Sequence, residues 1–230
     1  MNHTMNTTHK NFTQDPDSVI CCQSTSLRLQ DHPFVAAVVI DYDGMILWGN
    51  SRGKRLYFND PELDCDGKTI HDFLPDEMVI ERLGLLRMVC DTGRSAFFRQ
   101  ILGGKSIVTT YHKLNAPDGE TPRAIILSGE ATNDEQLIVP DHYFRFETKF
   151  VNFGALDKLS PREIEVLAMI SQGLTTDKIA EQLGRSPKTI EAHRSAISRK
   201  LGIGSRIGLS EVARRAGLQP CHASMKRVDL

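Results

Sequence analysis

Apolar residues follow two different patterns along this chain of 230 residues. Between about residues 34 and 131 they come in short runs, such as VAAVVID at 35–41, separated by turns that contain Gly or Pro. Short β-branched runs between turn signals are typical of strands. From residue 159 onward the apolar residues recur at intervals of three and four, which is typical of amphipathic helices. The pattern therefore predicts a sheet-containing front half and a helical back half.

The front half is expected to contain five strands and three helical segments. Asp43-Gly44 is a tight-turn signal that joins the first two strands as a hairpin, and further Gly and Pro residues delimit the other elements. Asn50 and Ser51 are suited to cap the first helix. The expected elements are strands at 35–41 and 45–50, helices at 51–58, 70–74 and 76–91, and strands at 94–102, 105–115 and 122–131.

One antiparallel sheet with helices on one face accounts for this order, which makes an α+β domain of roughly 100 residues. On the helix at 76–91, Met78, Leu85, Met88 and Val89 fall near one apolar face, with Arg82 and Arg87 elsewhere.

The front half resembles a PAS domain over residues 32–134. The resemblance rests on VVIDYDGMILWGNSRGKRLYF at 38–58, GKTIHDFLPDE at 67–77 and APDGETPRAIILSGEATND at 116–134. It implies a sensory or dimerisation domain that controls the helical back half. Residues 1–31 precede it; they are polar without a helical or strand period and are interpreted as a disordered tail.

Residues 135–154 are interpreted as an aromatic-rich linker. Five rings fall in or near it, at Tyr143, Phe144, Phe146, Phe150 and Phe153. A flexible linker is not expected to be so aromatic. The favoured interpretation is that the rings fill the seam between two domains, and the alternative is a signal-transmitting or dimerising segment.

Three capped helices are expected from residue 159 onward. Ser160-Pro161-Arg162-Glu163 is a capping box with Pro at the first helical position. Thr175 is expected to cap the second helix, which ends at Gly184, and Ser186-Pro187 starts the third. Two short helices separated by a three-residue turn form a helix-turn-helix, whose second helix enters the DNA major groove in proteins that use this motif.

A helical wheel divides the third helix into two faces. Ile190, Ile197 and Leu201 form a buried stripe, and the opposite arc presents a polar, basic surface. A small residue such as Ala192 permits close approach to bases, whereas Lys and Arg reach phosphates and Glu191, on the flank, accepts from cytosine. The residues that define the outward arc are Lys188, Ala192, Ser195 and Arg199.

This stretch resembles the LuxR/GerE-type helix-turn-helix over residues 155–218. The resemblance implies a four-helix domain whose last helix, at 205–217, forms a homodimer contact on double-stranded DNA. It also implies base contacts from the outward positions of the third helix and phosphate contacts from its Thr, Lys and Arg residues. The matching residues are Leu159, Pro161, Arg162, Glu163, Glu165, Val166, Leu167, Gly173, Leu174, Ile179, Ala180, Leu183, Ser186, Thr189, Ile190, His193, Arg194, Lys200 and Leu201.

Residues 219–230 are interpreted as a second tail. The resemblance and the wheel together give one set of candidate DNA-binding residues: Lys188, Thr189, Glu191, Ala192, Arg194, Ser195, Arg199 and Lys200.

Two positions of the motif depart from the common family pattern, and a third borders the buried arc. Lys178 stands where many members of the family carry Glu, which removes a capping-box partner at a cost of about 0.5–1 kcal/mol. Glu191 stands where some members carry Lys, which changes base preference. His193 lies at the edge of the buried arc and is interpreted as a packing residue that is also able to donate to a phosphate, not as a base reader or metal ligand.

The charge distribution agrees with DNA binding by the back half only. Residues 1–154 carry 15 Lys/Arg and 21 Asp/Glu, whereas residues 155–230 carry 13 and 8. No signal-peptide pattern and no apolar run of membrane length is present, so a cytoplasmic protein is expected. The five cysteines (Cys21, Cys22, Cys65, Cys90 and Cys221) show no metal-binding spacing and are expected to be free thiols.

Neither a cofactor nor an enzymatic activity is predicted. The sequence contains no Gly-rich phosphate loop, no Cys/His metal spacing and no Ser elbow. His71 and His112 are interpreted as surface residues, and a flavin-reactive cysteine is missing because Ile70 occupies its position in the PAS pattern.

The leading hypothesis is a homodimeric transcription regulator whose DNA binding is modulated by the PAS-like domain. One alternative is a quorum-sensing regulator with an acyl-homoserine-lactone-binding front domain. Such domains are rich in Trp and Tyr around the pocket, and only Trp48 is available here. Another alternative is a signalling adaptor that acts through protein–protein contacts. A small molecule or a protein partner at the PAS-like domain stays open.

Overall fold

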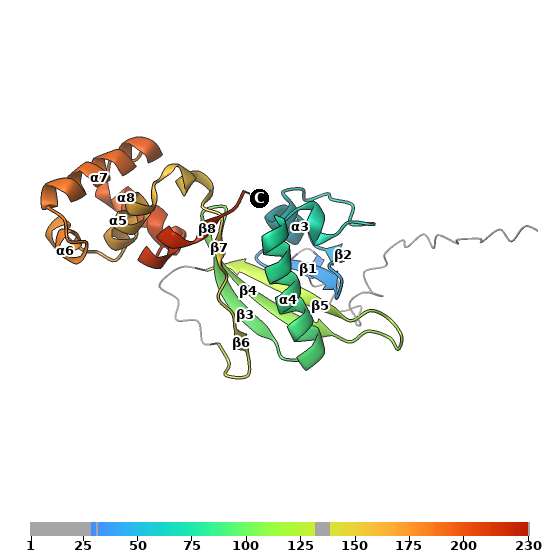
Figure 1. Ribbon diagram of the computed structural model, residues 1–230. Helices are drawn as coiled ribbons and strands as arrows, with labels where there is room; N and C mark the ends of the chain where they lie inside the picture. The colour runs from blue at the N-terminus through green and yellow to red at the C-terminus, as the bar shows by residue number, and fades with distance from the viewer. Residues whose placement is uncertain (1–28, 31, 132–138, 230) are drawn as a thin grey trace, which may run out of the picture.

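A computed structural model of the chain describes residues 29–30, 32–131 and 139–229. It confirms the α+β front domain and the helical back domain, which lie side by side with β7 and β8 between them (Figure 1). The expectation for the N-terminal tail, apart from residues 29–30, lies outside the described residues, as do Cys21 and Cys22.

The N-terminal domain is one sheet with the order β2-β1-β5-β4-β3-β6. Neighbouring strands are antiparallel except that β6 runs parallel to β3. Helices α3 and α4 lie against one face (Figure 1). The elements are β1 (Ala36–Asp41), β2 (Ile46–Gly49), α3 (Ser51–Phe58), the short 3₁₀ helix η1 (Ile70–Asp72), α4 (Asp76–Thr92), β3 (Ala96–Leu102), β4 (Lys105–Leu114), β5 (Arg123–Glu130) and β6 (Phe144–Arg145).

Local sequence explains the predicted hairpin and the first helix. The carboxylate of Asp41 accepts hydrogen bonds from the backbone amides of Asp43 (3.1 Å) and Met45 (2.8 Å), which shapes the turn. Asn50 caps α3 by accepting from the amide of Gly53 at 2.7 Å, and it also accepts from the amide of Ala37 at 3.0 Å. One side chain therefore ties the start of α3 to the neighbouring strand.

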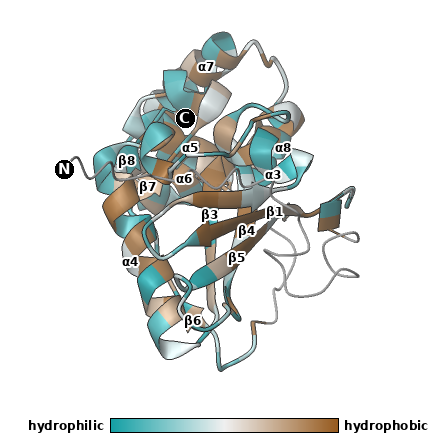
Figure 2. Ribbon diagram, turned by 90° about the vertical axis from the view of Figure 1, so that its right-hand side faces the viewer, coloured by the Kyte–Doolittle hydropathy of each residue, from teal (hydrophilic) through white to brown (hydrophobic). Residues whose placement is uncertain are grey.

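The main core lies between the sheet and α4. Sheet residues such as Val38, Phe98 and Ile126 pack there against Val79 and Leu86 of α4. In Figure 2, α4 lies beside strands β3, β4 and β5, and both the helix and the strands carry hydrophobic residues. A smaller cluster on other sheet positions contains Ala37, Val39, Trp48 and Ile125.

The expectation for Arg82 is wrong. Its side chain is not directed away from the core but is only 6% exposed, whereas Arg87 is exposed as expected. Arg82 falls on the same helical stripe as Met78, Leu85 and Val89, because residues four and three positions apart share a face. The sheet makes this burial tolerable by supplying Gln100, whose side-chain oxygen accepts from Arg82 at 2.9 Å.

The segment at 135–154 is not simply a linker. Among its described residues, Phe144–Arg145 extends the main sheet as β6, and β7 (Phe150–Val151) pairs in parallel with β8 (Lys226–Arg227) near the C-terminus. Phe150 and Phe153 are buried, Phe146 packs edge-on against Phe98, and Phe144 is exposed. The rings at 150 and 153 lie at the seam between the domains.

The segment at 219–229, expected to be a tail, is also structured. It forms the short helix η3 (Pro220–Ser224) before β8, and its backbone returns to β7. Its pairing partner at 150–151 lies about 75 positions earlier in the chain, so no local sequence pattern predicts this strand pair.

The C-terminal domain is helical. Its core contains Ile164, Leu167, Ile190 and Ile197, and it also includes Ile101 from β3 of the other domain. Its elements are the short helix η2 (Gly154–Lys158), α5 (Pro161–Ser171), α6 (Thr176–Gln182), α7 (Pro187–Leu201) and α8 (Arg206–Arg215).

A substitution at Gly53 tests the packing of α3 on the sheet. A Cβ at Gly53 would lie 2.4 Å from the carbonyl oxygen of Ala37, a backbone atom that cannot move aside easily. We expect Gly53→Ala to destabilise the N-terminal domain by about 1–3 kcal/mol in denaturant unfolding. The control is Gly84→Ala in α4, where a Cβ meets nothing within 4 Å; a gain of about 0.5–1 kcal/mol is expected there. Equal effects at the two positions would contradict this account of the packing.

Candidate nucleic-acid interface

The helix-turn-helix is built from three capped helices. The hydroxyl of Ser160 accepts from the amide of Glu163 at 3.3 Å, and the Glu163 carboxylate accepts from the amide of Ser160 at 2.7 Å. This is the predicted capping box. Thr175 and Ser186 cap α6 and α7 through their hydroxyls at 3.4 Å and 3.2 Å.

Packing fixes which face of α7 is turned outward. Ile190 and Ile197 are fully buried, and α7 packs against both α5 and α6. The four residues on the opposite face, Lys188, Ala192, Ser195 and Arg199, are all exposed. The structure therefore brings the predicted outward arc together on one accessible surface.

The other candidates on α7 are held by contacts within the domain. The Thr176 hydroxyl donates to the Glu191 carboxylate at 2.7 Å, and Arg194 donates to the same oxygen at 2.8 Å. These groups stabilise the carboxylate: the hydrogen bond from Thr176 and the charge of Arg194 outweigh partial desolvation and lower the pKa of Glu191. The corner between α6 and α7 is thus braced at the edge of the outward face.

Thr189 and His193 are less accessible than the outward face, whereas Lys200 is exposed but ion-paired. Thr189 is half-buried and its hydroxyl lies 2.9 Å from that of Ser186. His193 is also half-buried. Lys200 donates to the buried carboxylate of Glu163 at 2.6 Å, which joins the end of α7 to the start of α5.

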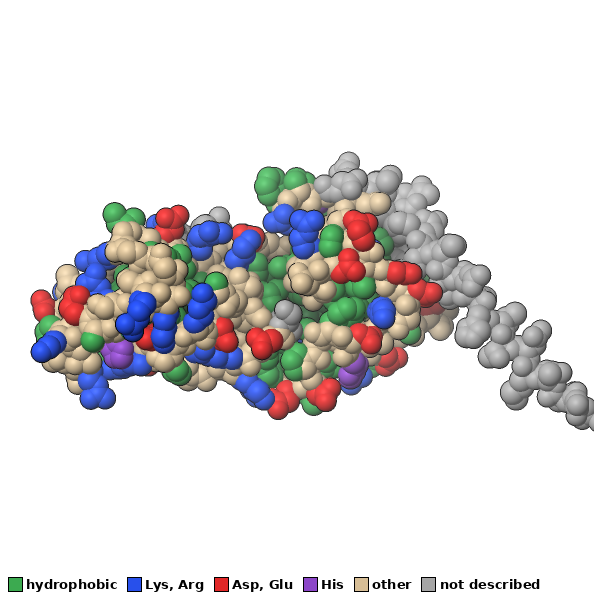
Figure 3. All heavy atoms as spheres, turned by 90° about the horizontal axis from the view of Figure 1, so that it is seen from above, with side chains coloured by type: hydrophobic (Ala, Val, Ile, Leu, Met, Phe, Trp, Pro, Cys, Tyr) green, Lys and Arg blue, Asp and Glu red, His purple; other side chains and the backbone are tan. Residues whose placement is uncertain are grey.

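The surface charge follows the division into two domains. In the view of Figure 3, Lys and Arg side chains gather over the C-terminal domain, while Asp and Glu are more frequent over the N-terminal domain. This arrangement suits a polyanionic partner at the C-terminal domain alone.

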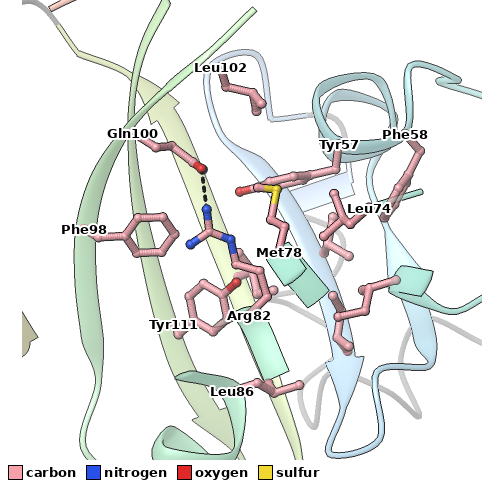
Figure 4. A pocket seen from close by; sticks show the side chains of 14 residues that line it. Tyr57, Phe58, Leu74, Met78, Arg82, Leu86, Phe98, Gln100, Leu102 and Tyr111 are labelled. Carbon is pink, nitrogen blue, oxygen red and sulfur yellow. Dashed lines mark hydrogen bonds between the residues drawn. The ribbon is translucent and has the colours of Figure 1, made fainter. Parts of the chain in front are cut away.

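The N-terminal domain contains a second candidate site, a cavity of about 40 Å³ between α3, α4 and the sheet. Most of its walls are apolar, but Tyr57, Arg82, Gln100 and Tyr111 also line it (Figure 4). A largely apolar pocket with a few convergent polar groups is the usual form of a small-molecule site.

A continuous chain of hydrogen bonds connects three polar residues of the cavity wall, Arg82, Gln100 and Tyr57. The Gln100 amide donates to the Thr109 hydroxyl at 3.3 Å, which lies 2.9 Å from the Ser128 hydroxyl, and that hydroxyl contacts Tyr57. Burial raises the pKa of Tyr57 and of Tyr111, so both phenols are neutral at physiological pH. The sequence analysis did not predict this set. The one local signal that could have indicated it is the spacing of Arg82 from Met78, Leu85 and Val89, which places a cation on the apolar stripe of α4.

The described residues show no group of three or more His, Cys, Asp or Glu side chains arranged to hold a metal ion. His71 is exposed on η1, and His112 is half-buried in β4, between the hydroxyls of Ser95 (2.9 Å) and Thr110 (3.0 Å). Within the same described part of the chain, no helix has the length and apolarity needed to cross a membrane.

Comparison with known families agrees with both domains. Residues 157–213 match the bacterial regulatory proteins of the luxR family, and residues 29–136 match the PAS fold. The C-terminal domain therefore contains a helix-turn-helix of the luxR type at residues 157–213. The match of residues 29–136 to the PAS fold confirms the predicted PAS-like domain in the N-terminal half.

Individual relatives match only part of this chain. The transcriptional activator protein BglJ of Escherichia coli is 49% identical over 55 residues, which are 24% of each chain. The oxygen regulatory protein NreC of Staphylococcus aureus is 45% identical over 105 residues, which cover 43% of this chain and 48% of NreC. This chain therefore spans less than half the length of these relatives.

Among solved structures, a ligand–DNA complex of VqmA from Vibrio cholera aligns over 86% of this chain and 90% of VqmA. The two sequences are 20% identical and the TM-score is 0.46, a likeness too weak to assign a ligand or a DNA site to this chain.

The ion pair between Lys200 and Glu163 makes a testable contribution to stability. Desolvation of Glu163 opposes its ionisation, but hydrogen bonds from Lys200 and Ser160 outweigh that cost and lower its pKa from 4.5. A carboxyl group with a lowered folded-state pKa stabilises the protein above its unfolded-state pKa, and the contribution is lost as pH falls through the folded-state value. We expect Glu163→Gln to lower the unfolding midpoint at pH 7, with the difference from the wild type shrinking below about pH 4.5.

Glu165→Gln is the matched control. Glu165 is half-exposed and pairs with Arg162 at 2.7 Å. It should show a smaller effect at pH 7, because exposed pairs contribute little. A Glu163→Gln difference that stays constant from pH 7 to pH 3 would contradict the proposed linkage.

Proposed function

We propose that this protein is a homodimeric, sequence-specific DNA-binding transcription regulator whose PAS domain controls the DNA-binding domain. The observation that carries the proposal is the outward face of α7, where Lys188, Ala192, Ser195 and Arg199 are exposed on a helix whose opposite side is fully buried. The match of residues 157–213 to luxR-family regulators supports the same conclusion.

In this proposal α7 enters the major groove. Ala192 and Ser195 approach base edges, because short side chains permit close contact and a Ser hydroxyl bonds either to donors or to acceptors. Lys188 and Arg199 contact the flanking phosphates and supply most of the affinity. Glu191 and Arg194 flank this surface, and their mutual ion pair would have to open for either to bind a base or phosphate directly.

Thr189 and Lys200 are assigned to the phosphate backbone by the family resemblance. Lys200 already pairs with Glu163, so we propose that its main contribution to DNA binding is to hold α7 in position. Thr189 lies at the start of α7 beside its capping residue, where backbone amides also favour a phosphate.

We also propose that α8 forms the dimer contact. Ile207, in its first turn, is 80% exposed, while Leu209 and Ala213 on the other side of the helix are buried. A large apolar side chain on an outward helix face gains from being covered by a second copy.

The PAS domain supplies the input. The apolar cavity with its polar chain supports a small-molecule signal, and its volume of about 40 Å³ restricts an unrearranged site to a very small ligand. The role we propose is regulatory rather than catalytic. Because the proposed partner is DNA, we also propose that the protein acts in the bacterial cytoplasm.

DNA binding can be tested with charge-removing variants on α7. Lys188→Ala and Arg199→Ala should each weaken binding to a cognate duplex and reduce the slope of log K against log salt by about one. Lys68→Ala, an exposed lysine of the PAS domain, is the matched control and should change neither quantity. Sites are first mapped with the wild-type protein across the genome. Absence of salt-dependent binding by the wild type to any mapped duplex would favour the adaptor alternative instead.

Dimerisation through α8 has its own test. Ile207→Asp should shift the protein toward monomers in sedimentation velocity and lower DNA affinity, because a charge at a buried interface position is poorly tolerated. Ile80→Asp is the matched control: Ile80 is 72% exposed on α4 of the PAS domain. If Ile80→Asp dissociates the dimer and Ile207→Asp does not, the dimer contact lies on the PAS domain.

A further inference from the structure

Two adjacent residues of α4 connect the cavity to the seam between the domains. Arg82 lines the cavity, with its guanidinium 4.6 Å from the ring centre of Phe98. Its Nη2 donates both to Gln100 Oε1 at 2.9 Å and to the Thr148 hydroxyl at 3.3 Å (the Gln100 bond is drawn in Figure 4). One nitrogen thus contacts a cavity residue and a residue of the seam at the same time.

Glu81 holds the same part of the seam. Its Oε1 accepts from the Thr148 hydroxyl at 2.7 Å, and its Oε2 accepts from the backbone amide of Lys149 at 3.0 Å. One turn earlier on α4, Glu77 forms an ion pair with Lys226 of β8. Helix α4 therefore contacts β8 and the two residues that directly precede β7, the other strand of the small sheet between the domains.

We call this small sheet, together with the residues that flank its two strands, the strap; it consists of residues 148–153 and 226–228. The Lys226 amide donates to the Lys149 carbonyl at 3.1 Å, and the Val228 amide donates to the Val151 carbonyl at 3.0 Å. The Asn152 side chain adds a bond of 2.8 Å to the Val228 carbonyl. The position of the Lys149 backbone, set by Glu81, thus determines how β8 is held.

The strap is attached to the DNA-binding domain through Arg227. Its guanidinium donates to the carbonyls of Asp157 and Leu159, both at 2.8 Å, and lies 5.1 Å from the ring centre of Phe153. Leu159 directly precedes Ser160, the cap of α5. A displacement of the strap is therefore passed to the first helix of the helix-turn-helix.

The connection at Arg82 is incompletely bonded. Its Nη1 is buried without a hydrogen-bond partner, although it lies 3.2 Å from Glu81 Oε1. A buried charged network that is only partly satisfied is costly, so a small change in its partners shifts the balance between arrangements. Gln100 is one of the two acceptors that orient Nη2, so a change at Gln100 alters the orientation of the guanidinium and with it the bond to Thr148.

We propose that the Glu81–Arg82 pair couples the PAS cavity to the strap, so that a change at Gln100 inside the cavity alters how firmly Thr148 and β8 are held. The proposal rests on the proposed function only in assigning the cavity as the site where a signal acts. Its structural content is that Gln100, a residue of the cavity wall, controls the stability of the strap through Arg82 and Thr148.

Hydrogen–deuterium exchange on the full chain, without DNA or ligand, tests this coupling. Thr148→Val removes the hydroxyl that bridges Arg82 and Glu81 while it keeps the side-chain shape. We expect exchange of the strap amides at 226 and 228 to accelerate roughly tenfold, the effect of losing about one hydrogen bond. Gln100→Met removes the cavity partner of Arg82, and we expect it to change the same rates several-fold from a distance.

Leu86→Met is the matched control, because Leu86 lines the same cavity but has no polar group to offer Arg82. It should leave the strap rates unchanged. Amides in the middle of α5 provide the reference for global opening, and a rise there equal to that in the strap means general destabilisation and overturns the coupling. A Gln100→Met protein with wild-type strap rates, or a Thr148→Val protein without faster exchange, also overturns it.

These outcomes separate the coupling from the proposed function. The exchange rates are measured without DNA, so a protein that fails to bind any duplex still gives a full test of the coupling. Conversely, a strap that does not respond to Gln100 leaves the effects of Lys188→Ala and Arg199→Ala on DNA binding intact.

Discussion

The two domains are held together by an apolar contact at the seam, where Ile101 packs with a buried ring and aliphatic side chains of the C-terminal domain. Ile101 lies near the end of β3, yet it belongs to the same apolar cluster as Phe153, Leu156 and Leu159. Burial of apolar surface is the main favourable term in domain association, and here it joins the sheet of one domain to the core of the other. The backbones approach closely at the same place: a Cβ on Gly104 would lie 2.7 Å from the Phe153 carbonyl oxygen, and one on Gly154 would lie 2.7 Å from the Gly103 backbone.

This seam gives the strap its importance. Apolar contact is non-directional, so it holds the domains together without specifying one orientation. The hydrogen bonds of residues 148–153 with 226–228, and the contacts of Arg227 with the Asp157 and Leu159 carbonyls, are directional and specify it. A regulatory signal that changes these few polar contacts changes orientation at less cost than one that must open the apolar cluster.

Inside the C-terminal domain, ionic contacts serve the same purpose of orientation. Lys200 and Glu163 join the ends of α7 and α5, and the contacts of Glu191 with Thr176 and Arg194 brace α6 against α7. Both contacts lie beside the outward face of α7 and leave Lys188, Ala192, Ser195 and Arg199 exposed. The proposed reading surface is thereby carried on a helix that is fixed at both ends.

Local sequence signals were sufficient for most of the fold, because caps, turns and apolar periodicity act over a few residues. The capping box at Ser160 and Glu163, the hairpin turn at Asp43-Gly44 and the outward arc of α7 all arise from such signals. The assignment of individual DNA-contacting residues remains a prediction, since it depends on a partner that the chain alone does not contain.

Three features were decided only by the tertiary structure. Arg82 is buried because the sheet places Gln100 opposite it, and a charge on an apolar stripe does not reveal whether such a partner exists. The strands at 150–151 and 226–227 are short and pair across about 75 residues, so neither has a strand signal of its own. The bond network from Gln100 through Arg82 to Thr148 joins residues from β3, α4 and the seam. Such non-local pairs form only when the whole chain has folded, because no stretch of a few residues contains both partners.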